Sequence, residues 1–253
     1  MSAIVLLPGM DGTGALLLDL AAALGTEFDV VVVSYPSDGA LDYAALERVA
    51  RAQLPSNQPF VLVAESFSGP IAISIAASNV AGLMGLVLCC TFAQCPRPTL
   101  RGLRVLIPMV RTSRVPAFAV RGLLLGRWST EPLQRAISAA LAKVSAAVVR
   151  ARLRSIMSVD VLAKLRQIAV PLLCVRATRD RLVPLSAANS IIRNAPTSRL
   201  AQLEGPHCLL QVAASSVAPV VLEFARGVGL TSNLSLNPDA SPVALARRPL
   251  GAG

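Results

Sequence analysis

The sequence, 253 residues long, is poor in the residues from which metal and disulfide sites are built. It has a single histidine, His207, which argues against a transition-metal centre because such centres draw mainly on His and Cys ligands. Its five cysteines are an odd number, and none belongs to a C-x-x-C pair. We therefore expect reduced cysteines in the core, no disulfide framework, no metal and no other cofactor.

Long uninterrupted apolar runs are also missing, although 54% of the residues are hydrophobic. No stretch free of charges and helix breakers is long enough to require a membrane span. The apolar start of the chain lacks the basic residues of a signal peptide, and Pro8, Gly9 and Asp11 interrupt it. The length suits one α/β domain with an insertion. We expect a soluble, cytoplasmic protein.

Lysine and aromatic residues are scarce, and the basic excess lies in one part of the chain. Only two of the 24 basic residues are lysines, and the net charge is +10. Residues 96–166 hold fourteen basic residues against Glu131 and Asp160, a net charge of +12, whereas the rest of the chain carries −2. Phe118 and Trp128 are the aromatics of this segment, so the stacking platforms typical of nucleic-acid binding are missing and no nucleic-acid partner is expected.

Short apolar runs alternate with helical patterns along most of the chain. Six runs predict strands, at residues 3–8, 28–36, 59–66, 83–92, 171–178 and 199–205. Helices are expected at about 14–24, 41–54, 68–79, 185–194 and 208–226. Strands that are apolar throughout suit a parallel sheet covered on both faces. The sequence therefore predicts a doubly wound α/β fold.

Two stretches depart from this alternation. Residues 95–168 contain helical patterns, Pro and Arg but no convincing strand, which indicates a helical cap inserted between strands. Residues 230–253 are rich in Ser, Pro and small residues without a period, which predicts a flexible C-terminal tail. The α/β core would then consist of residues 1–94 and 169–229.

The inserted segment also predicts a basic amphipathic helix. At about 100° per residue, five apolar residues share one face: Leu133, Ile137, Leu141, Val144 and Val148. Arg135, Lys143, Arg150 and Arg154 gather on another face. The alternative is an ordinary solvated face in an arginine-rich sequence.

The stretch VLVAESFSGP at residues 61–70 is a strand that stops at a serine. Pro70 suits the first turn of a helix, so Ser66 is expected on a tight corner between strand and helix. Such a corner exposes the hydroxyl, and the helix N-terminus favours negative charge beside it. The pattern alone is weak, because Ala64 and Ser68 replace the glycines of the G-x-S-x-G signature. A serine helix cap is the alternative.

Two further strand ends carry matching chemistry. Asp180 follows the strand at 171–178, and His207 follows the strand at 199–205. In a parallel sheet these positions lie on the same edge as Ser66, where ligands bind. A neutral imidazole can take the proton of a serine hydroxyl, and a carboxylate holds the other ring nitrogen in the required tautomer. The chain order Ser, Asp, His is the one expected of an α/β-hydrolase triad.

A glycine-rich loop, LPGMDGTG at residues 7–14, follows the first strand. Its spacing is G-x-x-G-x-G without G-K-[ST], and Asp11 would repel a phosphate, so the loop is a poor nucleotide site. The alternative is an oxyanion hole, in which the backbone N–H groups of Met10 and Phe67 converge on a developing alkoxide.

Together, LPGMDGTG, VAESFSG, TRDRLVP and EGPHCLL resemble the α/β-hydrolase superfamily, specifically its small serine esterases with a helical cap. The similarity spans nearly all of residues 3–226. The resemblance implies a nucleophile at Ser66, an acid at Asp180 and a base at His207. It also implies oxyanion-hole donors at Met10 and Phe67.

The chain departs from the pattern of that superfamily at three points. Both signature glycines are replaced. Pro8 stands where many members have histidine, and the first two strands of the family are missing, which leaves about six. These departures bear on substrate and rate more than on the fold.

Four other residues near the strand ends have competing interpretations. Asp160 is a rival for the triad acid, although it more simply caps the helix that follows. Glu65 is expected to point to the opposite side of the strand from Ser66. Cys208 is expected in a helix core, and Asp11 in a loop or cap role.

The sequence supports three functional hypotheses. The first is a carboxylic ester hydrolase that acts on a small-molecule ester through an acyl-serine intermediate. The second is an acyltransferase or thioesterase for lipid or carrier-bound acyl groups, whose basic cap would meet an anionic lipid surface or an acidic acyl carrier. The third, a non-catalytic binding protein, is disfavoured because Ser66 and His207 are both present. The oligomeric state is not predicted.

Overall fold

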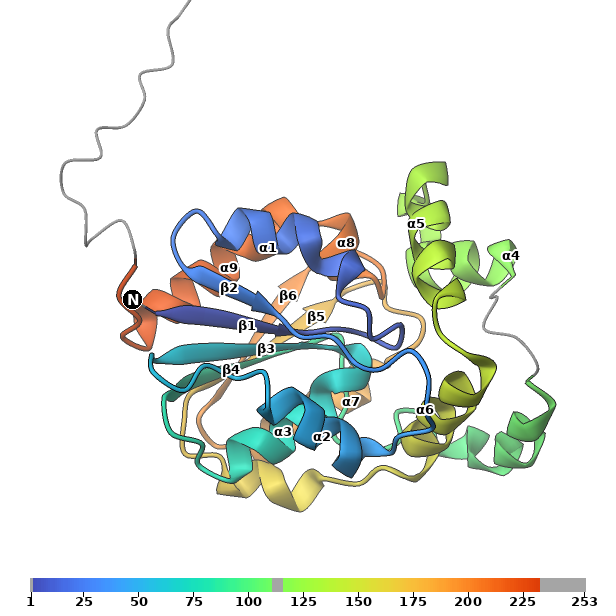
Figure 1. Ribbon diagram of the computed structural model, residues 1–253, viewed down its shortest axis with the longest axis horizontal. Helices are drawn as coiled ribbons and strands as arrows, with labels where there is room; N and C mark the ends of the chain where they lie inside the picture. Colours follow the sequence, from blue (N-terminus) through green and yellow to red (C-terminus); the bar gives the residue numbers. More distant parts are fainter. Residues whose placement is uncertain (1, 111–115, 233–253) are drawn as a thin grey trace, which may run out of the picture.

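A six-stranded parallel sheet forms the centre of the computed structural model, which describes residues 2–110 and 116–232 (Figure 1). The strands are β1 (Ala3–Leu7), β2 (Asp29–Val32), β3 (Phe60–Glu65), β4 (Leu83–Cys89), β5 (Leu172–Ala177) and β6 (Ser198–Leu203). Their order in the sheet is β2-β1-β3-β4-β5-β6, and every neighbouring pair is parallel. The predicted α/β class and all six predicted strands are confirmed.

Helices cover both faces of this sheet. The first face carries α2 (Tyr43–Arg51), α3 (Gly69–Ala77) and α7 (Leu185–Asn194). The second carries α1 (Leu18–Leu24), preceded by the short turn η1 (Ala15–Leu17), together with α8 (Leu209–Val212) and α9 (Ala214–Gly227). Figure 1 shows these two sets on opposite sides of the strands.

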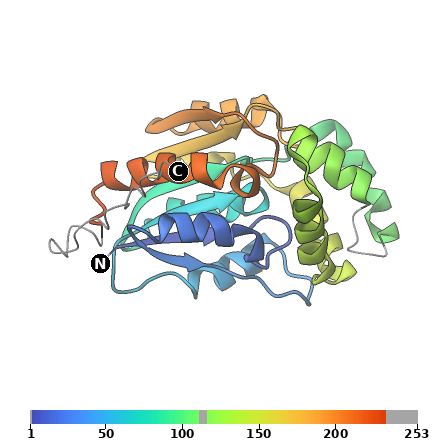
Figure 2. The same ribbon diagram turned by 90° about the horizontal axis from the view of Figure 1, so that it is seen from above.

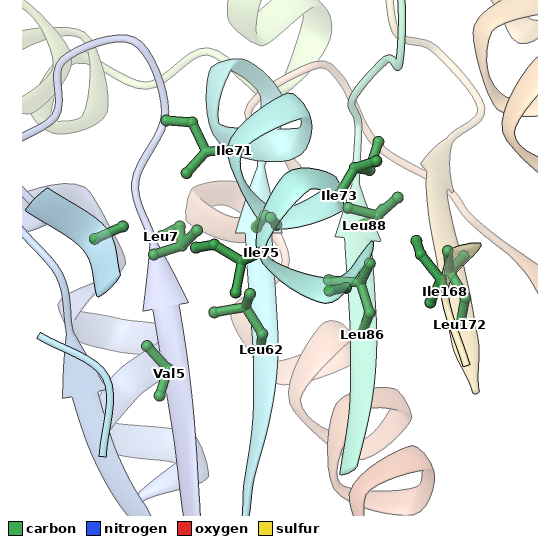
Figure 3. Packing of buried hydrophobic residues seen from close by; sticks show 14 of the residues in the cluster. Val5, Leu7, Leu62, Ile71, Ile73, Ile75, Leu86, Leu88, Ile168 and Leu172 are labelled. Atoms are coloured by element: carbon green, nitrogen blue, oxygen red, sulfur yellow. The ribbon is translucent and has the colours of Figure 1, made fainter. Parts of the chain in front are cut away.

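The central strands β1, β3, β4 and β5 supply side chains to two cores, and this explains their continuous hydrophobicity. In β1, Val5 and Leu7 enter the core beneath α3, whereas Ile4 and Leu6 enter the core beneath α1 and α9. Figure 3 shows the first core, where the isoleucines of α3 pack over the strand side chains. Burial on both faces stabilises the central strands of a parallel sheet, which have no solvated side.

The segment between β4 and β5 forms a separate group of helices. These are η3 (Pro98–Met109), α4 (Ala117–Ala119), η4 (Val120–Leu125), η5 (Gly126–Trp128), α5 (Glu131–Ala142), α6 (Ala146–Ser158) and η6 (Leu162–Gln167). Within the described part of this segment, β-pairing is limited to an isolated bridge between Gln94 and Asp160. Figures 1 and 2 place η3, α4, α5 and α6 at the end of the sheet toward which the strands point.

The single basic amphipathic helix predicted over residues 133–154 is wrong. The chain forms two helices, α5 and α6, because Ser145 caps α6: its Oγ accepts a hydrogen bond from the Val148 N–H at 3.3 Å. The Ser145 N–H in turn donates to the Ser37 carbonyl at 2.9 Å, which ties this break to the core. The capping hydrogen bond of Ser145 therefore starts a new helix, although apolar residues recur at helical spacing on both sides of it.

Several expectations concern residues at the edges of the described ranges. The predicted tail lies mostly at residues 233–253, outside the described residues, as do Arg111 and Arg114 of the basic segment.

The five cysteines are all described, all buried and none forms a disulfide. Among the described helices, none combines the length and the apolar character that a bilayer crossing requires.

Candidate active site

Ser66 begins a tight turn, η2 (Ser66–Ser68), between β3 and α3. Its φ of +46° lies in the left-handed region, which costs a residue with a side chain about 1–3 kcal/mol. Two neighbours sustain this conformation. The Thr91 hydroxyl, just beyond β4, donates to the Ser66 carbonyl, and a Cβ at Gly69 would overlap the Thr91 side chain. Glycine at position 69 therefore lets α3 start close to the sheet.

The two replaced signature glycines have clear places in this turn. Ala64 is fully buried in β3, in register with Leu7 and Leu88. The Ser68 hydroxyl donates to the Pro8 carbonyl at 2.5 Å and lies 2.8 Å from the Tyr35 hydroxyl. Ser68 therefore links the serine turn to the loop after β1.

Ser66, His207 and Asp180 form one chain of hydrogen bonds. The Ser66 Oγ lies 2.9 Å from His207 Nε2, and His207 Nδ1 lies 2.8 Å from Asp180 Oδ2. The second oxygen of Asp180 accepts the N–H groups of Leu182 and Val183 at 2.8 and 2.9 Å. The structure thus brings together three residues that are separated by up to 141 positions in the sequence.

Asp160 lies outside this group. Its carboxylate is exposed and accepts the N–H of Leu162, at the start of η6, at 3.1 Å. This contact matches the helix-capping role that was the alternative to Asp160 as the triad acid.

The two predicted oxyanion donors, Met10 and Phe67, line the same cavity as the serine. A buried arginine of α6, Arg152, holds both of them. Its guanidinium donates to the Met10 carbonyl at 2.6 Å and to the Pro36 carbonyl at 3.2 Å. It also lies over the rings of Phe67 and Tyr35, at 5.7 and 5.8 Å from their centroids.

Arg152 is 1% exposed, which is unusual for a charged side chain. Burial lowers the pKa of its guanidinium, and the nearby Asp11 carboxylate acts in the opposite direction. A Cβ at Gly12, whose φ is +69°, would lie 2.6 Å from the guanidinium. Among the described residues its Nε has no hydrogen-bond partner. The loop after β1 is therefore shaped around an arginine that comes from the insertion.

Glu65 lines the cavity together with Ser66. Its Oε2 accepts the Gln211 side-chain amide at 3.1 Å. Burial raises the pKa of Glu65 to about 7, an effect that His207 opposes and Asp11 reinforces.

Asp11 and Cys208 also line the cavity. The Asp11 carboxylate accepts the backbone N–H and the hydroxyl of Thr13, at 2.9 and 2.5 Å, as a loop residue would. Cys208 precedes α8 and packs with Val120, Leu125 and other apolar residues of the insertion. Neither side chain joins the hydrogen-bonded chain.

The cavity above Ser66 has a volume of about 370 Å³ and mainly apolar walls. Its floor comes from the loops at the strand ends. Most of its apolar walls come from the insertion: Leu100, Ala119, Leu123, Leu124, Ile137, Leu141, Val149, Leu153, Ile156 and Met157. Within the described residues, no three His, Cys, Asp or Glu side chains are grouped as metal ligands would be.

Three contributors to this site were not recognised in the sequence. Arg152 was counted with the basic residues of the insertion, although its position four residues after Val148 places it on the buried face of α6. Thr91 and Tyr35 lie beyond strand ends, where the sequence offers no motif. Their contacts depend on the packing of β3 between β1 and β4.

A parallel sheet that joins serine, histidine and aspartate side chains beyond its carboxyl edge has the architecture of an α/β-hydrolase. The comparisons with known proteins agree. The chain belongs to the Alpha/beta hydrolase family, whose family model matches residues 4–220. None of the curated proteins compared matches the chain significantly.

Solved structures share this fold at low sequence identity. An esterase from Thermogutta terrifontis is 19% identical, with a TM-score of 0.77 and 90% of each chain covered. A hydrolase from Pseudomonas aeruginosa PA01 is 17% identical, with a TM-score of 0.78, covering 88% of this chain and 89% of that one. An enol-lactonase from Burkholderia xenovorans LB400 is 17% identical, with a TM-score of 0.69 and coverages of 89% and 91%. Such identities show the fold alone.

Proposed function

We propose that this α/β-hydrolase is a serine carboxylesterase that cleaves carboxylic esters through an acyl-serine intermediate. One observation carries the proposal: the hydrogen-bonded chain Ser66–His207–Asp180 lies at the floor of an apolar cavity. The esterase among the similar structures is in keeping with it.

In the first half of the reaction, the Ser66 Oγ attacks the ester carbonyl while His207 Nε2 takes its proton. The Asp180 carboxylate accepts a hydrogen bond from His207 Nδ1–H and so stabilises the imidazolium. The N–H groups of Met10 and Phe67 are the donors proposed for the oxyanion. When the C–O bond breaks, His207 returns the proton to the leaving alcohol, and the acyl group stays on Ser66.

In the second half, water replaces the alcohol. His207 takes a proton from the water as it attacks the acyl carbonyl, and then returns the proton to the Ser66 oxygen as the acid leaves. A cavity of about 370 Å³ with apolar walls favours an acyl or alcohol chain of hydrocarbon character over a charged one.

An acyltransferase or a thioesterase is the second candidate. Both would use the same acyl-serine, with another acceptor in place of water or with a thiol as the leaving group. The observation that favours them is that the insertion, which holds most of the basic charge, supplies most of the apolar walls. A carrier-bound or lipid acyl chain would enter past that charge.

The experiment is turnover of p-nitrophenyl esters of increasing chain length, with a thioester alongside, by the parent protein and Ser66→Ala. We expect loss of turnover by several orders of magnitude in Ser66→Ala and covalent labelling of the parent by a serine-directed phosphonate at Ser66 only. Ser216→Ala, at an exposed serine of α9, is the control and should behave as the parent. Substantial esterase activity in Ser66→Ala would overturn the proposal.

A further inference from the structure

Exposed apolar side chains gather on two elements of the insertion, η3 and the α4–η4 segment. The described residues include ten large hydrophobic side chains that are exposed, and seven of them lie here: Leu100, Leu103, Val105, Leu106, Met109, Phe118 and Leu123. Val105, Met109 and Phe118 are 72%, 72% and 79% exposed. Burying such side chains is favourable, so a concentration of them on one surface indicates a contact surface.

Arginines are interspersed with these apolar residues. Residues 96–130 contain seven arginines and no acidic residue. Arg101, Arg104 and Arg121 are exposed, and within the described residues they form no ion pair. We call the exposed apolar residues and these three arginines the apolar–arginine rim.

The rim adjoins the active-site cavity. Leu100 of η3 and Leu123 of η4 are 39% and 47% exposed, and both also line the cavity. The apolar surface outside is therefore continuous with the apolar walls inside. Figures 1 and 2 place η3 and α4 at the same end of the molecule, beyond the carboxyl edge of the sheet.

The chemistry of the rim distinguishes between possible partners. A second copy of the chain would bring the three rim arginines against the same three arginines, and the rim itself has no acidic residue to pair with them. A lipid layer with anionic headgroups meets both features at once, because arginines bind its headgroups while neighbouring apolar side chains enter the acyl boundary.

We propose that the apolar–arginine rim docks this protein on an anionic lipid surface, with the cavity entrance facing the lipid. This inference rests on the proposed function for one point, that acyl groups from the lipid layer reach Ser66 through that entrance. Docking itself needs no turnover, so it is tested separately.

The binding experiment uses vesicles of phosphatidylcholine with and without phosphatidylglycerol, measured by flotation with Ser66→Ala protein. We expect binding to the anionic vesicles that weakens as salt rises. Arg101→Gln, Arg104→Gln and Arg121→Gln together should weaken it about a hundredfold, since each basic side chain near such a surface contributes about fivefold. Val105→Ser, Met109→Ser and Phe118→Ser together should weaken it at least tenfold.

Matched controls change the same chemistry elsewhere. Arg48→Gln, Arg193→Gln and Arg199→Gln remove equal charge from exposed core positions, and Leu18→Ser with Leu185→Ser removes exposed apolar groups there. Both controls should bind within about threefold of the parent. The proposal is overturned if the parent does not bind anionic vesicles, or if the control variants lose as much vesicle binding as the rim variants. It is also overturned if the parent binds an acidic acyl carrier protein instead of vesicles.

The activity experiment then separates docking from chemistry. The rim variants should hydrolyse p-nitrophenyl butyrate in water at the parental rate, since none of the six substituted residues lines the cavity. On p-nitrophenyl dodecanoate in anionic vesicles they should be at least tenfold slower than the parent. Inactivity of the parent on both esters, with vesicle binding intact, would refute the proposed function and leave the docking surface standing.

Discussion

The Asp180 carboxylate uses both oxygens, one for His207 and one for two backbone N–H groups. In Asp180→Asn the amide oxygen should keep the backbone contacts, which turns the NH₂ toward His207 Nδ1. His207 then holds its proton on Nε2 and cannot accept the Ser66 proton. We expect kcat to fall by about 10⁴-fold with KM little changed, measured on a soluble ester.

Asp160→Asn is the control for this substitution, because Asp160 is exposed and binds only the Leu162 N–H among the described hydrogen bonds. It should retain parental kcat and change stability slightly. Equal losses of kcat in both variants, with the fold intact by circular dichroism, would contradict the assignment of the acid.

Glu65 makes stability depend on pH in an unusual direction. Burial raises its pKa from 4.5 to about 7, so the folded state keeps a proton that the unfolded chain releases in this range. The stability contributed by the neutral side chain is fully present below pH 4.5 and is lost as the pH rises to about 7, by about 3 kcal/mol in all. Glu65→Gln stays neutral and should lack this loss.

Urea unfolding at pH 5 and pH 8 measures the difference between the parent and Glu65→Gln. We expect the variant to gain up to about 3 kcal/mol relative to the parent on going from pH 5 to pH 8. The groups that face Glu65 are His207, Asp11 and the Gln211 amide, all of which both proteins retain. A difference independent of pH would show that Glu65 is ionised in the folded protein throughout.

The strand-turn-helix unit β3–η2–α3 depends on close approach at Gly69. A Cβ there would overlap Thr91, whose hydroxyl holds the Ser66 carbonyl. Gly69→Ala should therefore destabilise the fold by about 1–3 kcal/mol and lower kcat, because the backbone at Ser66 must shift. Thermal unfolding and esterase kinetics measure the two effects.

Two glycines of the insertion provide the matched control for Gly69 in the β3–η2–α3 unit. Gly102 and Gly122 have open space where a Cβ would be built and no positive φ. Alanine at either position should be neutral or slightly stabilising. If Gly69→Ala resembled these controls in both measurements, the close approach of α3 to Thr91 would not limit the turn.

The whole chain buries its five thiols at 1–8% exposure. Burial raises the pKa of Cys174 to about 12 and that of Cys208 well above its usual range, while a hydrogen bond to Cys90 and then burial raise that of Cys89. The native protein should therefore react slowly with Ellman's reagent at pH 8, and iodoacetamide should leave turnover unchanged. After unfolding in urea, all five thiols should react; rapid reaction of the native protein would contradict this.

The sheet and the three hydrogen-bonded residues were predictable because they depend on local patterns at strand ends. Residues 59–66, 171–178 and 199–205 each show a strand with a polar residue at or after its end, and parallel topology brings those ends together. The place of Glu65 in the cavity wall was not predictable from the strand pattern, since its partner Gln211 lies on a distant helix. The burial of Arg152 was also hidden, because its partners are backbone carbonyls on distant loops.

Arg152 has a consequence for how substrate enters. Helix α6 supplies side chains that line the cavity, and it also supplies Arg152, which donates to the Met10 carbonyl. If α6 swung outward to widen the entrance, the guanidinium would leave the Met10 carbonyl, and the loop around it would lose its support. An outward position of α6 and the present arrangement of the Met10 loop would then exclude each other, so a site widened in this way would lose the support of one proposed oxyanion donor.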